Sequence, residues 1–339
     1  MRFGFEYFPV SRLRRSVRFL LLLLPSLGIS ACDAAGRSDR EVPTLPTRER
    51  WTLRFDQNDV AADFDDVFLL DTIVLTVESS TAQISAFETD SGHQLWKRGQ
   101  RGAGPGEYLE PKQLFGYSPN LVGVVDTRQG RITLLRGDGT TDRLITGERA
   151  TGDLTNVCGS NDGTILAVRL PQFEIVRIDE QPEATVLYRL GWPVPIYNET
   201  PLLQQGLFAR SREGDCVVYQ PRGDFFFSVV GDSLPTDRFH RYSQPYPAQT
   251  LDRTKQYPQI SPGGVAAAYA VVKADSLFVL RGGITKGDKG RVDVYLLQTG
   301  ERVAQFTLPP QTYKFDVEGD RLIVLQSTES GSLLTLYQR

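Results

Sequence analysis

The stretch Asp71-Thr-Ile-Val-Leu-Thr-Val77 places a turn residue directly before a strongly apolar run. Short apolar runs bounded by Asp, Asn or Gly are typical of β-strands. Five later segments repeat this layout, and the residue before each apolar run is Asn120, Gly163, Asp215, Asp275 and Asp320. The steps between the six positions are 49, 43, 52, 60 and 45 residues. Because a four-stranded propeller blade repeats every ~40–50 residues, six units predict a six-bladed β-propeller.

The rest of each unit also has strand character. A second, more polar strand follows each apolar one, at residues 83–89, 130–136, 173–179, 225–230, 290–297 and 332–337. No stretch of ten or more residues carries the apolar spacing of an amphipathic helix. We therefore predict an all-β fold with four-stranded antiparallel blades, since a sandwich would not explain six equivalent units.

The two ends of the chain complement one another. Arg50-Trp-Thr-Leu-Arg-Phe55 reads as a strand that precedes the first unit, whereas the last unit stops at Arg339 without an outer strand. Pairing these two segments would complete the sixth blade and cover two open sheet edges, which otherwise invite aggregation. We expect the N-terminal strand to close the propeller, which then occupies residues 49–339.

One stretch carries a more specific pattern. It begins Gly99-Gln-Arg-Gly-Ala-Gly-Pro-Gly-Glu-Tyr108 and continues through a strand to the hairpin turn at Asp138-Gly139. Over residues 99–139 the chain resembles an NHL-type repeat, and it is similar to bacterial lipoproteins named for their six-bladed β-propeller fold. The resemblance implies that fold but no activity. Glycines there permit positive-φ turns and close backbone approach, whereas a phosphate-binding loop would need a Gly-Lys-Ser/Thr ending that is absent.

The N-terminal segment has the layout of a secretory signal. Basic residues 12–18 precede the apolar run Phe19–Leu24 and small residues that end at Cys32. The segment resembles a bacterial lipoprotein signal, so we expect residues 1–31 to be removed and Cys32 to be lipidated. The alternative, a transmembrane anchor, would need ~20 apolar residues. Polar, proline-bearing residues 32–48 read as a flexible tether. These features predict a lipid-anchored protein of the bacterial cell envelope, facing the periplasm or the exterior.

The net charge bears on the possible partners, and the cysteine content bears on a possible disulfide. The chain has 38 basic and 41 acidic residues, and loss of residues 1–31 removes five arginines and one glutamate, which leaves a net charge of −7. This balance argues against nucleic-acid binding, and we expect a monomer. Cys158 and Cys216 form an even pair once Cys32 carries the lipid. The sequence leaves open whether they form a disulfide or remain two free thiols.

Residues for catalysis are scarce. The chain has two histidines, His93 and His240, both in polar segments, and no Gly-x-Ser-x-Gly or His-Glu-x-x-His motif. We therefore predict no catalytic residue, no metal site and no cofactor. Some propeller hydrolases hold calcium with Asp, Asn and Glu of inner loops, for which the candidates here are Asp126, Asn156, Asn198 and Glu199. Ordinary turn chemistry accounts for the same residues.

Arginines recur after the apolar strand in four consecutive units, at Arg128, Arg169, Arg222 and Arg281. The connections that hold them should open on the same face as the long inter-blade loops, which add Arg101, Tyr197 and Tyr257. An arc of guanidiniums with nearby tyrosines suits an acidic ligand or an acidic patch on a partner. The plain alternative is a set of unrelated, solvated loop arginines.

Two function classes follow from these features. The first is a membrane-tethered binding or scaffold propeller that docks a protein, peptide or glycan of acidic character on its loop face. The second is a calcium-dependent propeller hydrolase or lyase of the periplasm. The lack of catalytic motifs and the long basic loops favour the first class, although a fold alone establishes no function.

Overall fold

The computed structural model describes residues 48–56, 64–146, 154–160, 163–169, 174–178, 185–189, 207–211, 216–219, 225–229, 239–241, 250–252, 259–261, 269–281, 289–329 and 331–338. The chain divides into two compact units, residues 1–41 and 42–339, and all described residues belong to the second. The calls on the signal peptide, on Cys32 and on residues 32–47 of the tether lie outside the described residues. Within the described ranges, no helix has the length and apolar character that crossing a bilayer would require.

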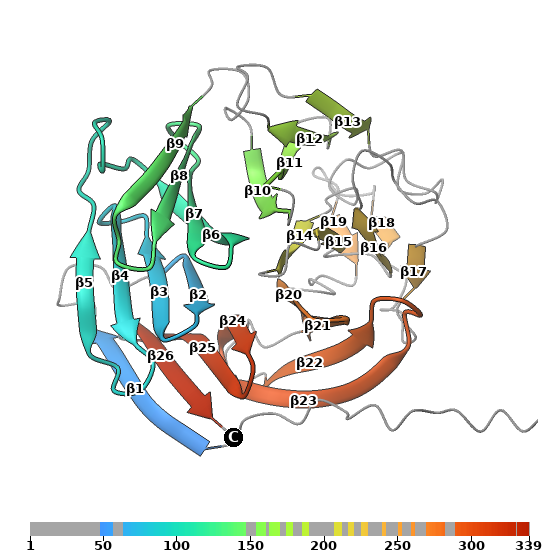
Figure 1. Cartoon of the computed structure of the whole chain (residues 1–339). Helices are drawn as coiled ribbons and strands as arrows, with labels where there is room; N and C mark the ends of the chain where they lie inside the picture. The colour runs from blue at the N-terminus through green and yellow to red at the C-terminus, as the bar shows by residue number, and fades with distance from the viewer. Residues whose placement is uncertain are drawn as a thin grey trace, which may run out of the picture. The chain divides into compact units, whose positions relative to one another are not determined.

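The described elements are β-strands, which Figure 1 shows in chain order. The first three sheets each contain four consecutive strands. The first holds β2 (Asp66–Leu70), β3 (Ile73–Glu78), β4 (Gln83–Glu88) and β5 (Gln94–Arg98). The second holds β6 (Pro111–Ser118), β7 (Leu121–Asp126), β8 (Arg131–Arg136) and β9 (Thr141–Thr146). The third holds β10 (Leu154–Gly159), β11 (Ile165–Arg169), β12 (Glu174–Ile178) and β13 (Thr185–Arg189).

The later part of the chain forms a larger sheet. One four-strand group is β14 (Leu207–Ser211), β15 (Cys216–Tyr219), β16 (Phe225–Val229) and β17 (Phe239–Arg241). The other is β20 (Tyr269–Lys273), β21 (Ser276–Arg281), β22 (Lys289–Leu296) and β23 (Arg302–Pro310). Between them β18 (Thr250–Asp252) and β19 (Gln259–Ser261) form a separate two-stranded sheet.

The two groups merge into one eight-stranded sheet because β14 pairs in parallel with β20. The junction consists of the pairs Arg210↔Val271 and Ser211↔Val272. The structure consequently has five sheets of four or more strands among its described residues, where the repeats predict six separate blades. The fold is an all-β propeller with four-stranded antiparallel blades.

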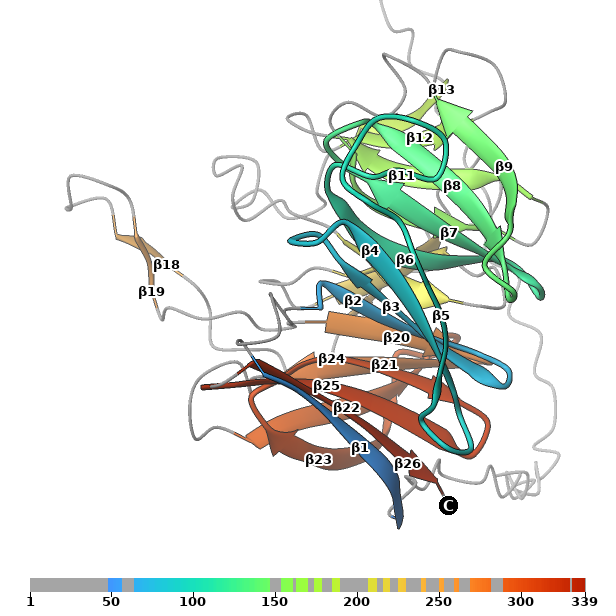
Figure 2. The same ribbon diagram turned by 90° about the vertical axis from the view of Figure 1, so that its left-hand side faces the viewer.

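The last sheet joins the two ends of the described chain. Its order is β1 (Arg48–Asp56), β26 (Gly331–Gln338), β25 (Arg321–Thr328) and β24 (Thr312–Glu318). Strand β1 runs antiparallel to β26, with Leu53 opposite Leu334, and the two lie side by side in Figures 1 and 2. Trp51 ties β1 to the first sheet, because its Nε1 donates to the carbonyl of Thr89 at 2.8 Å.

The core lies between neighbouring sheets. The second strand of the first sheet, β3, is buried along its whole length, which explains why its sequence is mainly apolar and does not alternate. Phe68, Leu75 and Ile84 of the first sheet pack with Leu114 of the second. Similar clusters join the other neighbours, for example Phe278 with Phe315. Each such side chain contributes about 1.5–3 kcal/mol on full burial.

The first strands of successive sheets also contact one another. β2 contacts β6, followed by β10, β14, β20 and β24 in turn, and β24 contacts β2. At four of these joints a polar side chain bonds the backbone of the neighbouring strand. The pairs are Asp316 Oδ2 with Leu69 N at 2.8 Å, Asp66 Oδ2 with Leu114 N at 2.9 Å, Gln113 Oε1 with Val157 N at 2.9 Å, and Asn156 Oδ1 with Phe208 N. These bonds satisfy N–H groups that would otherwise be buried without an acceptor.

Candidate binding surface

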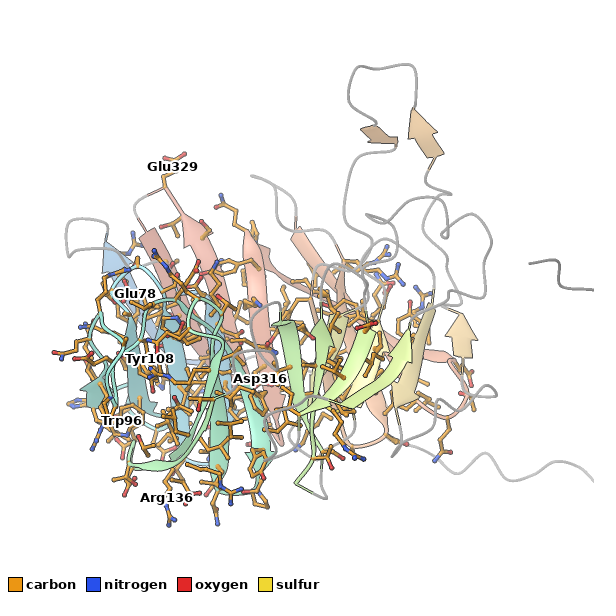
Figure 3. All side chains as sticks on the ribbon, turned by 90° about the horizontal axis from the view of Figure 1, so that it is seen from above. Glu78, Trp96, Tyr108, Arg136, Asp316 and Glu329 are labelled. Carbon is orange, nitrogen blue, oxygen red and sulfur yellow. A yellow bond between two sulfur atoms is a disulfide. The ribbon has the colours of Figure 1, made fainter. Side chains whose placement is uncertain are left out.

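The turns of the sheets lie at two opposite edges, which Figure 3 shows from the side. Glu78 and Glu329 lie at one edge, and Trp96 and Arg136 lie toward the other. Because neighbouring strands run antiparallel, the turn after β3, the β5–β6 connection and the turn after β7 all belong to the edge of Glu78. We call this edge the loop face, and its described part includes residues 78–82, 99–110, 127–130 and 329.

The β5–β6 connection is a compact loop built around a glutamate. The Glu107 carboxylate accepts from Gly104 N at 2.7 Å and from Gln100 Nε2 at 2.7 Å, and these bonds lower its pKa. A Cβ on Gly102 would lie 2.1 Å from that carboxylate, so the close approach requires glycine. The Gly-x-Gly-Pro-Gly-Glu sequence thus lets the loop fold around the side chain of Glu107.

Arg131 also stabilises the β5–β6 loop through hydrogen bonds to its backbone. Its guanidinium donates to the carbonyls of Gly104, at 3.2 Å, and Glu107, and it lies over the Tyr108 ring at 5.4 Å from the centroid. Gln129 adds a bond from its Nε2 to the carbonyl of Gly102 at 2.6 Å. Arg131 is 4% exposed, so its role here is to hold the loop, and it is not offered to a ligand.

Asp126, a candidate calcium ligand, is fully buried. Its carboxylate accepts from the backbone N–H groups of Leu109 at 2.7 Å, Glu110 at 3.1 Å and Gln129 at 3.0 Å. These bonds join the β5–β6 loop to the turn after β7, which accounts for Asp126 as a structural residue. Asn156 binds the backbone of Phe208, whereas Asn198 and Glu199 lie outside the described residues. In the described part of the chain no three His, Cys, Asp or Glu side chains gather as metal ligands would.

Arg101 lies on the loop face, as the sequence predicts, and is exposed. Its guanidinium donates to the carbonyls of Ser80 at 2.7 Å, Ser79 at 3.3 Å and Leu109 at 3.3 Å. Arg101 therefore joins the β3–β4 turn to the β5–β6 loop while its charge remains at the surface.

Arg128 is exposed in the turn after β7, which belongs to the loop face. Both Arg128 and Arg101 lower the pKa of Glu110, although the hydrogen bond from Lys112 is the largest cause. Lys112 Nζ lies 2.6 Å from Glu110 Oε1. Lys112 thus contacts the partly exposed carboxylate of Glu110, and the charges of Arg101 and Arg128 act on it. We call Arg101, Glu110, Lys112 and Arg128 the basic corner. Glu110 and Lys112 are members that the sequence reasoning missed.

Two further carboxylates border the basic corner. Burial raises the pKa of Asp65, whose Oδ2 accepts from Ser79 N at 2.6 Å. Burial also raises the pKa of Glu78, whose Oε1 accepts from Ser80 Oγ at 2.9 Å. Lys112 partly offsets the shift at Asp65. Protonation of these groups as the pH falls would increase the positive charge of this part of the loop face.

Arg281 does not contribute an exposed guanidinium to the predicted arc. It is 3% exposed, its Nε lies 2.8 Å from Asp293 Oδ2, and it donates to Tyr295 Oη at 2.9 Å. Asp293 is fully buried and neutralises Arg281 within the same sheet. Asp293 stands between two buried valines on β22, so the local sequence pattern gave no signal of this partner.

The remaining predicted residues are not brought together by the described part of the structure. Arg169 is the last residue of β11, and only the backbone of Arg169 is described. Arg222, Tyr197 and Tyr257 lie outside the described residues. Of the two histidines, His93 is exposed in the turn after β4, at the edge opposite the loop face.

Cys158 and Cys216 are joined in a disulfide. Their Cα atoms are 5.8 Å apart, and 58 residues separate them in the chain. Cys158 belongs to β10 and Cys216 to β15, so the bond links two neighbouring four-strand groups. The alternative of two free thiols, which the sequence left open, is not the arrangement in this structure.

Comparison with known proteins gives the fold and no family. No protein-family model matches the chain, and no curated protein sequence matches it. A virginiamycin B lyase from Staphylococcus aureus, in a catalytically inactive form with quinupristin, superposes with a TM-score of 0.51 at 10% identity, over 85% of this chain and 99% of that one. U3-55K superposes with a TM-score of 0.51 at 11% identity, over 86% and 98%. At such identities the similarity concerns the propeller architecture alone.

Proposed function

We propose that this chain is a binding propeller of the bacterial cell envelope that docks an acidic protein, peptide or glycan on its loop face. The observation that supports this most is the basic corner, where Lys112 contacts Glu110 and the charges of Arg101 and Arg128 act on the same carboxylate. Arginine is suited to such contacts because its planar guanidinium binds carboxylates in a bidentate fashion. Arg169, Arg222, Tyr197 and Tyr257 extend the proposed surface over the following units.

The rigidity of the basic corner favours binding. Arg101 is fixed by three backbone carbonyls, and the turn that carries Arg128 is fixed by Asp126 and Gln129. A surface that is already ordered loses little conformational entropy when a partner docks. The loop face thus offers an ordered backbone and a fixed Arg101 guanidinium to a partner.

The proposal includes six blades closed by the N-terminal strand. Its support is the order of contacts among β2, β6, β10, β14, β20 and β24, which returns to β2. The antiparallel pairing of β1 with β26 supports closure. In this view the eight-stranded sheet is two blades that touch through β14 and β20, so the long loops of all six units open on a common face.

The N-terminal sequence supports a proposal about the location of the protein. We propose that residues 1–31 are a signal peptide, that Cys32 carries lipid, and that the propeller faces the periplasm or the exterior as a monomer. The disulfide between Cys158 and Cys216 supports an oxidising compartment. We propose no cofactor and no nucleic-acid partner. Among the residues that the structure describes, no cluster of ligands supports the alternative of a calcium-dependent hydrolase or lyase.

A titration with a defined acidic probe tests the proposal. The probe is a fluorescein-labelled peptide of glutamates, measured by anisotropy at low and at moderate salt. We expect Arg128→Ala, combined with Arg222→Ala, to weaken binding about two- to thirtyfold, because exposed ion pairs each contribute ~0.2–1 kcal/mol. The matched control is Arg136→Ala, an exposed arginine at the opposite edge. Equal affinity for wild type and the double variant, or an equal loss in Arg136→Ala, would contradict docking on the loop face.

A further inference from the structure

Two partly exposed arginines meet on the outer strands of the β20–β23 group. Arg291 lies on β22 and Arg302 lies on β23. Arg291 Nε is 3.5 Å from Asp293 Oδ1, and Arg302 Nη1 is 3.6 Å from the same oxygen. The two arginine side chains are 40% and 24% exposed, whereas Asp293 is fully buried. One buried carboxylate oxygen therefore holds two guanidiniums at the surface.

The strand pairing places further polar groups beside these arginines. Arg291 and Asp293 are two residues apart on β22, so their side chains share one face of the sheet. Their partners on β23 are Thr307 and Gln305, and directly paired residues lie on the same face. Both partners are exposed, and Gln305 Oε1 accepts from Arg302 Nη1 at 3.3 Å. This face thus carries two guanidiniums, an amide and a hydroxyl group.

The two oxygens of Asp293 have different surroundings. Oδ2 lies 2.8 Å from Arg281 Nε and accepts from Tyr295 Oη at 3.3 Å, so it is bound within the sheet. Oδ1 accepts no hydrogen bond from the described residues, and the buried Nε of Arg291 donates none to them. Their 3.5 Å separation makes them an ion pair. A guanidinium has five N–H donors, so this attraction orients Arg291 while N–H groups remain for a ligand.

We propose that Arg291 and Arg302 bind a phosphate group, free or as a monoester, on the outer face of β22 and β23. A phosphate dianion has several acceptor oxygens and can accept from both guanidiniums at once, with the Thr307 hydroxyl as a further donor. Arginine matches phosphate geometry through paired N–H groups. Asp293 is the positioning residue, because it holds both guanidiniums before the ligand arrives. The site is separate from the basic corner and does not depend on the proposed docking.

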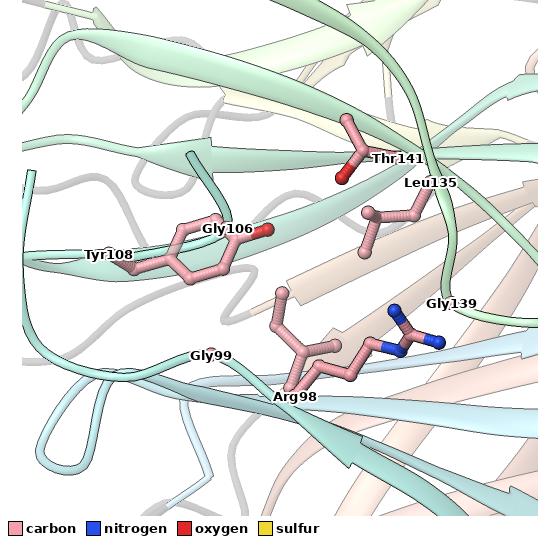
Figure 4. A pocket seen from close by; sticks show the side chains of 8 residues that line it. Arg98, Gly99, Gly106, Tyr108, Leu135, Gly139 and Thr141 are labelled. Carbon is pink, nitrogen blue, oxygen red and sulfur yellow. The ribbon is translucent and has the colours of Figure 1, made fainter. Parts of the chain in front are cut away.

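A single exposed arginine on another sheet provides the matched control. Arg98 is exposed on β5 and lies along the wall of a hollow of about 250 Å³ between the first two sheets (Figure 4). The described residues that line this hollow include no second arginine. Arg98→Gln therefore removes the same charge as Arg302→Gln, but from a place that lacks a neighbouring guanidinium.

Titration with inorganic phosphate and with methyl phosphate tests the site at constant ionic strength. The readout is the Nε–H resonance of Arg291 in a protein isotope-labelled at arginine and assigned with Arg291→Lys, because a buried N–H exchanges slowly with water. We expect a saturable shift with phosphate and weaker binding of acetate, which has one charge. Arg302→Gln should weaken phosphate binding about tenfold, because it removes a charge-assisted contact. Arg98→Gln and Arg128→Ala should bind phosphate like wild type.

The two probes also separate the sources of the phosphate group. A response to methyl phosphate alone supports a phosphorylated molecule as the ligand, and a response to both probes supports recognition of the phosphate group itself. The proposal is overturned if the Arg291 resonance responds to neither probe, if acetate binds as tightly as phosphate, or if Arg302→Gln and Arg98→Gln weaken binding equally. Loss of glutamate-peptide binding in Arg128→Ala with intact phosphate binding would support two separate sites.

Discussion

Neighbouring sheets meet through their first strands, and the contact between β6 and β10 differs in kind from the contact between β14 and β20. We call each such contact a joint. At the first, the Gln113 amide accepts from Val157 N at 2.9 Å and donates to Val157 O at 2.8 Å. At the second, the backbones of Arg210 and Val271 pair directly. A side chain inserted between two strands keeps their sheets separate, whereas direct pairing merges them. The number of sheets therefore depends on which kind of bond closes each joint, not only on the number of repeats.

Loss of the disulfide between Cys158 and Cys216 should lower the free energy of unfolding more than any other change considered below. Replacing both cysteines, as Cys158→Ser with Cys216→Ser, removes a cross-link over a separation of 58 residues. The chain-entropy account of disulfides gives about 4 kcal/mol for a loop of this length. Urea unfolding of the double variant against the oxidised wild type measures the loss. Mass spectrometry of the wild type with and without reductant is the control, and two thiols free to react with maleimide before reduction would contradict the bond.

The second largest loss of stability is expected at the joint between β2 and β6, which Asp66 bridges. Its carboxylate is fully buried, accepts from Leu114 N at 2.9 Å and lies 3.6 Å from Lys314 Nζ. Asp66→Ala leaves the N–H and the lysine without this partner, so we expect a loss of about 3 kcal/mol in the free energy of unfolding. Asp66→Asn keeps an oxygen for Leu114 N and should recover part of the loss. If alanine and asparagine behaved alike, the backbone bond would not matter at this joint.

Much of the strand pattern was predictable because it is local. The turn at Asp71 and the apolar run after it predict a strand where β3 (Ile73–Glu78) lies, and the polar run from Gln83 predicts β4 (Gln83–Glu88) almost to the residue. Gly99 and Gly106 have the positive φ that the glycine-rich stretch indicates. These features depend on residues within a few positions of one another, which a single sequence displays.

The site was harder to predict because its contacts are not local. Arg128 and Arg101 were expected on one face, and both lie near Glu110, but nothing in the sequence pairs Arg281 with Asp293 across two strands. The same limit applies to the merged sheet, since parallel pairing of β14 with β20 depends on how closely two strands far apart in sequence approach. Charge and spacing identify candidates, and tertiary contacts decide which of them stay exposed.

The joint made by the N-terminal strand should show the smallest of the three effects. Trp51 is partly exposed, its ring packs against Gly92, and its Nε1 donates to the carbonyl of Thr89 at 2.8 Å. Because full burial of such a ring is worth ~3–5 kcal/mol, we expect Trp51→Ala to cost about 2 kcal/mol. Urea unfolding followed by far-UV circular dichroism measures this cost.

Two control variants separate the packing of Trp51 from its hydrogen bond and from the general cost of removing a large apolar side chain. Trp51→Phe keeps most of the packing and loses the hydrogen bond, so it should cost about 1 kcal/mol. Leu95→Ala removes a large apolar side chain that is 49% exposed on β5 and should change stability by less than about 0.5 kcal/mol. If Trp51→Ala were as mild as Leu95→Ala, β1 would add little beyond its backbone pairing with β26, and the ends of the chain would be joined more weakly than the sheets in the middle.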